Sequence, residues 1–233
     1  SLRPFLMENL RDLRRRIRAI RSTQQITHSM KLVSTARFSR IQSLLAVHRR
    51  FAQEFEEAVS VLPFSRVEHP LLRPRSGGKI LLVPITSDRG LCGAYNVNLL
   101  RFALSFASSL PAEKEAVWLP IGRKGYLYLQ WRKHTLLHSF QRLPISLPLK
   151  AISPIASYIQ NLYEKENFEG VHLFYTRFVS MGKQIPQHIP LLPILPPERK
   201  ERKEEIRYLY EPEGEEMVRR ILPRLLEVRL HQA

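Results

Sequence analysis

The residues with the greatest potential for chemistry stand in one short stretch, SDRGLCG. Its polar, glycine and thiol residues are Ser87, Asp88, Arg89, Gly90, Cys92 and Gly93. Glycines that join a strand to a helix can present backbone N–H groups to a phosphate. The interval between Gly90 and Gly93 matches neither the dinucleotide-binding fingerprint nor the P-loop, and no lysine follows it. We therefore interpret the loop as a turn with helix capping, and keep a small-molecule site as an alternative.

Nucleophilic and metal-binding chemistry finds little support elsewhere. Cys92 is the only cysteine, which excludes an intramolecular disulfide and a multi-cysteine metal cluster. A cation such as Arg89 would activate its thiol on contact, but a lone thiol near a buried strand is more often a small apolar filler. His134 and His138 are four residues apart and could share a helical face, yet no third ligand is in view. The sequence predicts no catalytic, cofactor-binding or metal-binding residues, and therefore no enzyme.

Basic residues are concentrated at the start of the chain, with seven arginines from Arg3 to Arg21. The whole chain carries 37 Lys and Arg against 21 Asp and Glu, a formal net charge of +16. Such an excess favours polyanionic partners, which include nucleic acid, acidic membrane surfaces and acidic protein surfaces. A basic coiled-coil adaptor for nucleic acid is one interpretation, although the exposed aromatics that stack on bases are not evident. A rod within an acidic protein sleeve fits the same charges.

The elements that must position these residues begin with a long helix. Neither glycine nor proline occurs over 5–62, and prolines bracket that run. At about 1.5 Å per residue, a helix filling most of it would be roughly 75 Å long and would have to project from an ordinary domain. Its heptad seam is polar in the middle, where apolar residues shift sideways to Ile26, Met30 and Val33. The seam is mainly apolar at both ends, at Leu10, Leu13, Ile17 and Ile20 and again at Ala52, Phe55, Val59 and Leu62. We predict a coiled-coil shaft helix over 5–62.

The composition changes after this helix. Residues 63–78 are rich in proline, glycine and arginine and predict a linker. From 79 to 212, apolar runs such as KILLVPI, AVWLPIG and GVHLFYTRF alternate with helical periodicity. Strands separated by helices predict a Rossmann-like α/β domain of mostly parallel strands flanked by helices. Within it, we expect the proline-rich segment 185–205 to be an irregular edge and loop, and 206–212 to be a last strand.

Two further helices are indicated by their termini. Ser153 and Pro154 predict a helix start, because serine caps helices and proline suits the first helical turn. Residues 213–233 begin with acidic residues that favour a helix N-terminus. Pro223 should bend that helix or join two helical pieces. Apolar residues still recur where the chain stops, so we expect 213–233 to be the start of a truncated C-terminal shaft helix.

Three stretches in combination resemble one known family. They are the helix LRDLRRRIRAIRSTQQITHSMKLVSTARFSRIQ, the loop ITSDRGLCGAYNVNL and the late segment YLYEPEGEEMVRRILPRLLEVRLHQA. Together they resemble the gamma subunit of F-type ATP synthases, over nearly the whole chain. Two departures stand out: family members often have two glycines where this chain has Gly93-Ala94, and most of their C-terminal helix is absent here.

The resemblance implies a central rotor stalk that is itself non-catalytic and binds no cofactor. The N- and C-terminal helices would form an antiparallel coiled coil inside a hexamer of alpha and beta subunits. The foot of this shaft would dock on the epsilon subunit and the ring of c subunits. Proton or sodium flow through the ring would turn the shaft and drive the beta subunits through their catalytic conformations, for ATP synthesis or, in reverse, hydrolysis.

The resemblance also assigns partner contacts, position by position. Those expected to face the alpha–beta hexamer are Arg14, Arg15, Arg18, Gln24, Ile26, Thr27, Met30, Lys31 and Arg37. The SDRGLCG loop would be structural or would touch the rotor foot. No nucleic acid partner is then expected, and no membrane insertion, because the longest apolar runs are too short to cross a bilayer. The implied location is peripheral, on the cytoplasmic side of a bacterial cell inner membrane, in preference to the mitochondrial inner membrane.

Overall fold

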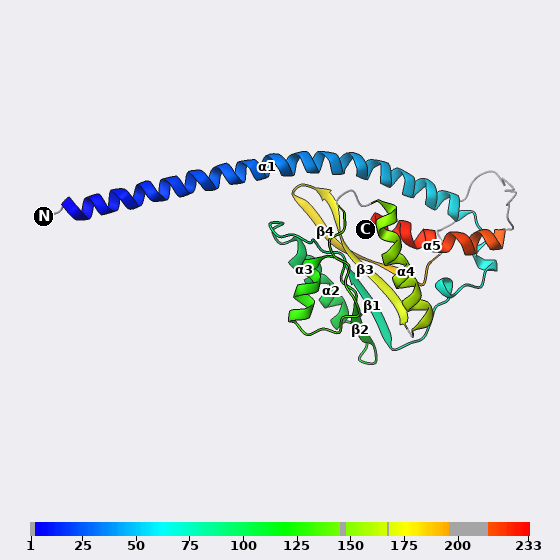
Figure 1. The fold of residues 1–233 in the computed structure, drawn as a ribbon. Helices are drawn as coiled ribbons and strands as arrows, with labels where there is room; N and C mark the ends of the chain where they lie inside the picture. The colour runs from blue at the N-terminus through cyan, green and yellow to red at the C-terminus, as the bar shows by residue number, and fades with distance from the viewer. Residues whose placement is uncertain (1–2, 145–147, 167, 196–213) are drawn as a thin grey trace. The chain divides into compact units, whose positions relative to one another are not determined.

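The long run without glycine or proline forms a single helix, α1 (Arg3–Ser60), of 58 residues (Figure 1). The chain divides into two units, Ser1–Arg50 and Phe51–Ala233, so α1 makes up the first unit and enters the second. The structure in Figure 1 is a computed structural model. The residues that it describes are 3–144, 148–166, 168–195 and 214–233.

The polar middle of α1 satisfies its hydroxyl groups within the helix. Thr23 donates from its hydroxyl to the Ala19 carbonyl at 3.0 Å, and Thr35 donates to the Lys31 carbonyl at 2.9 Å. Bonds of this kind allow Ser and Thr to remain in a helix interior without a tertiary partner. The helix is therefore continuous even where its seam is polar.

At its C-terminal end, α1 buries the seam that the heptad pattern predicts. Ala52 and Val59 are buried at 2% and 0% exposure, and Phe55 packs partly buried against the same core. Leu62, the next seam position, is also buried just beyond the helix. Burial at these positions fixes the end of α1 in the second unit.

A four-stranded sheet forms the centre of the second unit, in the order β2-β1-β3-β4. The strands are β1 (Lys79–Pro84), β2 (Glu115–Trp118), β3 (Phe168–Ser180) and β4 (Lys183–Leu192). Strand β1 is parallel to β2 and to β3, whereas β4 is antiparallel to β3. The α/β class and the mostly parallel sheet are confirmed.

Helices cover both faces of this sheet (Figure 1). One face carries α2 (Tyr95–Ser108) and α3 (Arg123–Trp131), and the other carries α4 (Leu149–Lys165) and α5 (Gly214–Gln232). Alternating residues of β1 divide between the two layers. Ile80 and Leu82 pack under α2 and α3, whereas Leu81 and Val83 belong to the core shared with α4 and α5.

The proline-rich segment after 184 differs from its predicted structure. Its first part is the regular strand β4, not an irregular loop, and it pairs with β3 from Lys183 to Leu192. Pro186 and Pro190 fit because β4 is at the edge of the sheet that the described strands form, where a missing N–H can face away from the neighbouring strand. The predicted last strand, 206–212, lies outside the described residues.

The helix boundaries at two prolines also differ from the predictions. Helix α4 begins at Leu149, so Pro154 lies inside it, and the Ser153 hydroxyl donates to the Leu149 carbonyl at 3.5 Å instead of capping. Helix α5 is continuous through Pro223, so the expected join between two pieces is absent from 214–232. Each proline costs one backbone hydrogen bond, and the buried residues on the same helices compensate for it.

The segment between α1 and β1 packs against the second unit through two 3-10 turns, Phe64–Arg66 and Pro70–Leu72. Phe64 and Leu71 are buried, and the Ile194 N–H donates to the Leu71 carbonyl at 2.7 Å. Within the described part of the chain, no helix combines the length and apolarity needed to cross a membrane.

Candidate partner-binding surface

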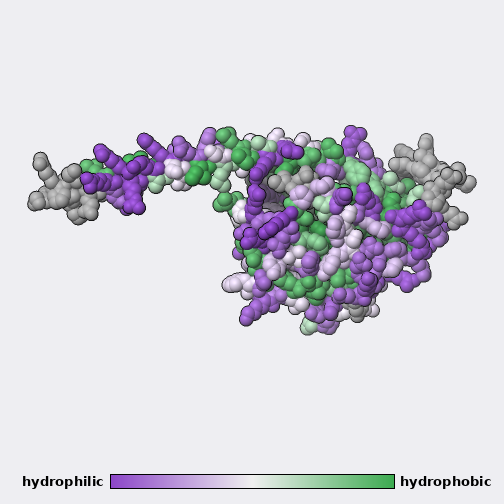
Figure 2. All heavy atoms as spheres, in the orientation of Figure 1, coloured by the Kyte–Doolittle hydropathy of each residue, from purple (hydrophilic) through white to green (hydrophobic). Residues whose placement is uncertain are grey.

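All nine positions predicted to contact a partner lie exposed on α1 in the first unit. Figure 2 shows hydrophilic and hydrophobic residues both reaching the surface along this helix. A helix turns by about 100° per residue, so sequence position gives the face on which each residue lies. The nine residues fall on three faces rather than one.

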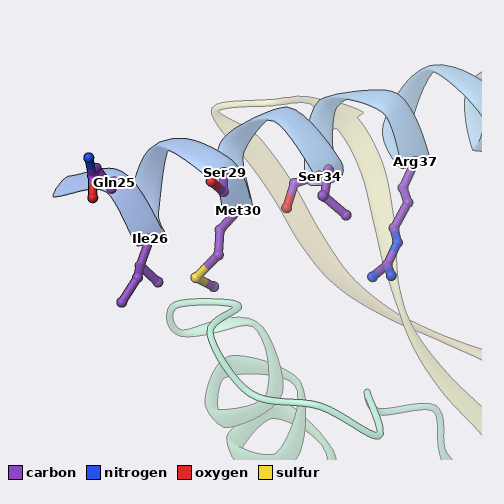
Figure 3. Close-up of a pocket in the computed structure, with 7 residues that line it drawn as sticks. Gln25, Ile26, Ser29, Met30, Ser34 and Arg37 are labelled. Carbon is purple, nitrogen blue, oxygen red and sulfur yellow. The ribbon is translucent and has the colours of Figure 1, made fainter. Parts of the chain in front are cut away.

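The first face is an apolar strip. Ile26, Met30, Val33 and Arg37 recur at helical spacing and lie within an arc of about 60°; we call them the Met30 strip. Figure 3 shows the side chains of Ile26, Met30 and Arg37 extending to the same side of α1. The three apolar members are 58%, 44% and 51% exposed, which is unusual for adjoining large apolar residues and indicates a surface that a partner covers.

Val33 belongs to this strip but was not among the predicted contact residues. Together with its neighbours it lines a shallow hollow on the helix, formed by Gln25, Ile26, Ser29, Met30, Val33, Ser34 and Arg37. The three-and-four spacing from Ile26 through Met30 to Val33 is the sequence signal that places it here.

The other predicted residues extend around the rest of the helix. Gln24, Thr27 and Lys31 form a polar face centred about 120° from the Met30 strip. Arg14, Arg15 and Arg18 spread over an arc of about 100° on the opposite side, in which Arg15 is in line with Val33 and Arg14 and Arg18 lie farther round. The structure therefore does not gather the nine residues on one face. They encircle α1, and only a partner that surrounds the helix could contact all of them.

A further apolar face lies nearer the N-terminus of α1. It consists of seam residues with between 42% and 67% of their surface exposed: Leu10, Leu13, Ile17 and Ile20. On the described part of the first unit they have no buried apolar neighbours. This face is that of a coiled-coil helix without its partner.

The SDRGLCG loop follows β1 and holds the start of α3. The Asp88 carboxylate accepts from the Arg123 N–H at 2.9 Å, and the Ser87 carbonyl accepts from the Lys124 N–H at 3.0 Å. One residue earlier, the Thr86 hydroxyl accepts from the Gly125 N–H at 2.8 Å. The first-turn N–H groups of α3 are thus bonded to the loop and are not available to a phosphate. The loop does cap a helix, but the helix is α3 and not the adjacent α2.

Asn96, which sequence reasoning missed, fixes the other end of the loop. Its side-chain oxygen accepts from the Ser87 N–H at 2.9 Å, and its amide donates to the Cys92 sulfur at 3.2 Å. Cys92 itself is exposed, so the apolar-filler interpretation is wrong. The thiol lies on the loop surface because the residues from Leu91 to Gly93 turn outward through left-handed backbone angles at both ends, with φ of 64° and 58°.

The two histidines considered as metal ligands do not share a helix. His134 follows α3 and packs on Trp118 with ring centroids 5.5 Å apart, whereas His138 packs between Phe140 and Tyr158. Burial, with a smaller effect from the charge of Arg132, lowers the pKa of His134. In the described ranges, no group of three or more His, Cys, Asp or Glu residues is placed to hold a metal ion.

Another histidine has the most perturbed environment among these rings. His172 on β3 lies beside His188 on β4, with ring centroids 5.7 Å apart, and Phe106 of α2 packs on both at 4.8 Å. Burial, followed by repulsion from His188, lowers the pKa of His172 to about 4. This cluster belongs to the packing between α2 and the sheet.

Comparison with known sequences identifies relatives that match nearly all of the chain. The family profile described as ATP synthase matches residues 9–233. The ATP synthase gamma chain of Desulforamulus reducens is 33% identical over 229 residues, covering 97% of this chain and 80% of that relative. The ATP synthase gamma chain of Desulfitobacterium hafniense is 36% identical over 227 residues, with 96% of this chain and 79% of that one covered.

A solved structure has the same fold. A chain in the central stalk and c-ring structure of the Tetrahymena thermophila mitochondrial ATP synthase superposes with a TM-score of 0.65 at 22% identity. The superposition covers 89% of the present chain and 90% of that chain. At this level of identity, the likeness establishes the fold that the two chains share.

Proposed function

This chain belongs to the gamma-chain family of ATP synthases, and we propose that it works as the central rotor stalk of such a complex. In this role it couples ion flow through a membrane ring to the conformational cycle of catalytic beta subunits. The chain itself carries out no chemistry. Its rotation imposes different conformations on the three catalytic sites in turn, during ATP synthesis or hydrolysis.

The distribution of contact residues around α1 is the observation that supports the proposal most directly. A helix that binds one partner along one side needs one apolar stripe. On α1, the Met30 strip, the Lys31 side and the arginine side all face outward. A shaft that turns inside a ring of subunits presents each of its faces to the ring, and different chemistry on each face allows the ring to respond to its orientation.

The charge of α1 agrees better with a protein sleeve than with nucleic acid. Phe38 is the only aromatic residue from 10 to 50, so α1 offers no series of rings on which bases could stack. The apolar Met30 strip interrupts the positive surface, which would not help a helix to follow a phosphate backbone. A ring of subunits with acidic and apolar inner surfaces satisfies both features.

Each of the two units has its own partners in this proposal. Helix α1 contacts an alpha–beta hexamer, and the α/β domain contacts the epsilon subunit and the c-ring. In this arrangement the chain is a peripheral subunit on the cytoplasmic side of a bacterial inner membrane. The SDRGLCG loop has a structural role in holding α3, and its exposed tip faces the rotor foot or a neighbouring subunit.

Reconstitution with alpha and beta subunits tests the role directly, and Cys92 makes it practicable. Because Cys92 is the only cysteine and is exposed, one thiol-reactive fluorophore reports on the α/β domain. We expect stepwise rotation of the probe when ATP is supplied to an immobilised complex. A second label, on Met181→Cys in a Cys92→Ser background, excludes an artefact of the loop, because Met181 is 76% exposed at the turn between β3 and β4.

Failure to assemble, together with salt-dependent binding to unrelated DNA, would instead favour the nucleic-acid adaptor. Binding of a nucleotide to the isolated chain, lost on changing Gly90, would favour the small-molecule interpretation of the loop.

A further inference from the structure

Helix α3 turns one face to solvent, and that face combines cations with large apolar residues. Its members are exposed and lie within an arc of about 120°; we call them the α3 face: Arg123, Lys124, Leu127, Gln130 and Trp131. The opposite side of the helix is anchored in the core by Leu129, which is fully buried. The α3 face is thus held rigidly outward by the packing beneath it.

Trp131 is the most unusual residue of this face. It is 76% exposed, whereas the other tryptophan of the chain, Trp118, is 1% exposed. Leu127, one turn earlier on the same face, is 42% exposed. The guanidinium of Arg132 lies 5.3 Å from the Tyr128 ring centroid and 5.8 Å from that of Trp131, which keeps a cation beside the exposed indole.

The sequence that surrounds α3 carries charge of one sign, while the Asp88 carboxylate of the preceding loop binds the backbone at its first turn. Between Glu115 and Glu164 the sequence contains six Lys and Arg residues and no Asp or Glu. Arg123 and Lys124 occupy the first turn of α3, where positive charge opposes the helix dipole. Lys133 closes the helix in a left-handed conformation with φ of 59°. Cations in the first turn destabilise the N-terminus of α3, and an anionic partner would offset that cost.

The geometry points to the α3 face as a docking surface for an anionic phospholipid bilayer. Trp131 and Leu127 enter the interfacial region, where the indole ring is preferred. Lys124, Arg132 and their neighbouring cations remain level with the phosphate groups, and each adds a small increment of attraction. This binding goes beyond the rotor role and does not depend on it.

A bilayer fits this surface better than an acidic protein does. Stable protein interfaces bury roughly 800 Å² on each partner, which is far more than one nine-residue helix presents. A bilayer has no such minimum, because its surface charge acts collectively on several cations.

The two tryptophans permit a local test on the full-length protein. In a Trp118→Phe variant, Trp131 is the sole indole. Its fluorescence emission is recorded separately with phosphatidylglycerol vesicles and with phosphatidylcholine vesicles. We expect a blue shift with phosphatidylglycerol vesicles, quenching by brominated acyl chains, and loss of both in high salt. Phosphatidylcholine vesicles should produce neither change.

Charge reversal separates the α3 face from the basic helix α1, which will also attract anionic vesicles. Lys124→Glu with Arg132→Glu should abolish the blue shift and the quenching. Arg14→Glu with Arg15→Glu removes the same charge from α1 and should leave the Trp131 signal intact. Vesicle binding that leaves Trp131 unaffected would overturn the proposal, as would a blue shift caused by polyglutamate but not by phosphatidylglycerol, which would indicate an acidic protein partner.

Discussion

The Asp88 carboxylate accepts the backbone N–H of Arg123 at 2.9 Å, across 35 residues of sequence. Two segments that follow different strands are thereby joined, because Asp88 comes after β1 and Arg123 opens the helix after β2. The bond gives α3 an N-terminal cap that its own preceding residue, Gly122, has no side chain to provide. The loop that looked like a ligand site is therefore part of the framework.

Removal of this cap should destabilise the second unit. We expect Asp88→Ala to lower the free energy of unfolding by about 1 kcal/mol, the usual cost of losing a capping oxygen. Asp88→Asn retains an acceptor and should recover most of the loss. Urea unfolding, followed by the fluorescence of buried Trp118 in a Trp131→Phe background, measures the unfolding free energy of both variants. Equal midpoints for Asp88→Ala and the parent would show that the cap contributes nothing.

Three glycine-to-alanine changes should rank in a defined order. At Gly122, with φ of 95°, an added Cβ would lie 2.0 Å from the Thr86 carbonyl oxygen, so Gly122→Ala should cost more than about 3 kcal/mol. Gly93 has φ of 58° but open space, and its change should cost about 1 kcal/mol. Gly182→Ala meets no atom within 4 Å and should change stability by less than about 0.5 kcal/mol. Thermal unfolding gives the order directly, and a Gly122→Ala protein as stable as Gly182→Ala would contradict it.

Acid should weaken the packing of α2 on the sheet through His172. Its pKa falls from 6.5 to about 4 in the folded protein. The neutral ring therefore stabilises the fold above about pH 6.5, and this contribution is lost as the pH falls from 6.5 towards 4. We expect His172→Leu to flatten the pH dependence of the unfolding free energy in this window. His28→Gln, on exposed α1, is the control and should retain the parent slope; the same slope in His172→Leu would contradict the assignment.

A cation in the Met30 strip should impair coupling in the assembled complex. Met30→Lys places a charge where we propose that an apolar, flexible side chain meets the surrounding subunits, and an unpaired charge at such a contact is costly to desolvate. We expect ATP hydrolysis to continue while ion pumping per ATP falls several-fold. Met30→Leu conserves volume and apolarity and should behave like the parent. Unchanged coupling in Met30→Lys would remove this face of α1 from the contact with the hexamer.

The first unit should be poorly protected when the chain is alone. Helices without tertiary packing are marginal in water, and the seam from Leu10 to Ile20 is exposed. We expect fast amide exchange over 10–37, or self-association that buries this face, and strong protection on addition of alpha and beta subunits. A strictly monomeric chain with 10–37 fully protected would contradict this expectation.

Local sequence patterns were sufficient to predict the regular parts of the fold. The long helix could be predicted because nothing in 5–62 breaks it, and β1 because its apolar run is short and bounded by turn residues. The burial of Ala52 and Val59 follows from the same heptad seam. In each case the signal lies within a few residues of the structure that it specifies.

Features that depend on distant residues could not be predicted in this way. Pro186 and Pro190 argue against a strand until β4 is known to be an edge. The burial of neighbouring residues on α4 outweighs the cost of Pro154, but only the folded core reveals that burial. The capping of α3 by Asp88 joins parts of the chain whose sequences give no sign of each other. The division of the contact residues into three faces was accessible from helical spacing, once α1 was known to be exposed there.

The two prolines of β4 affect how readily the unassembled chain aggregates. A sheet edge with all of its N–H groups is a template on which strands from other copies can add, and such growth leads to aggregation. Among the described strands, β4 forms one such edge, and Pro186 and Pro190 interrupt its N–H groups twice within ten residues. These two prolines should therefore limit edge-to-edge polymerisation of the α/β domain before the subunit is assembled.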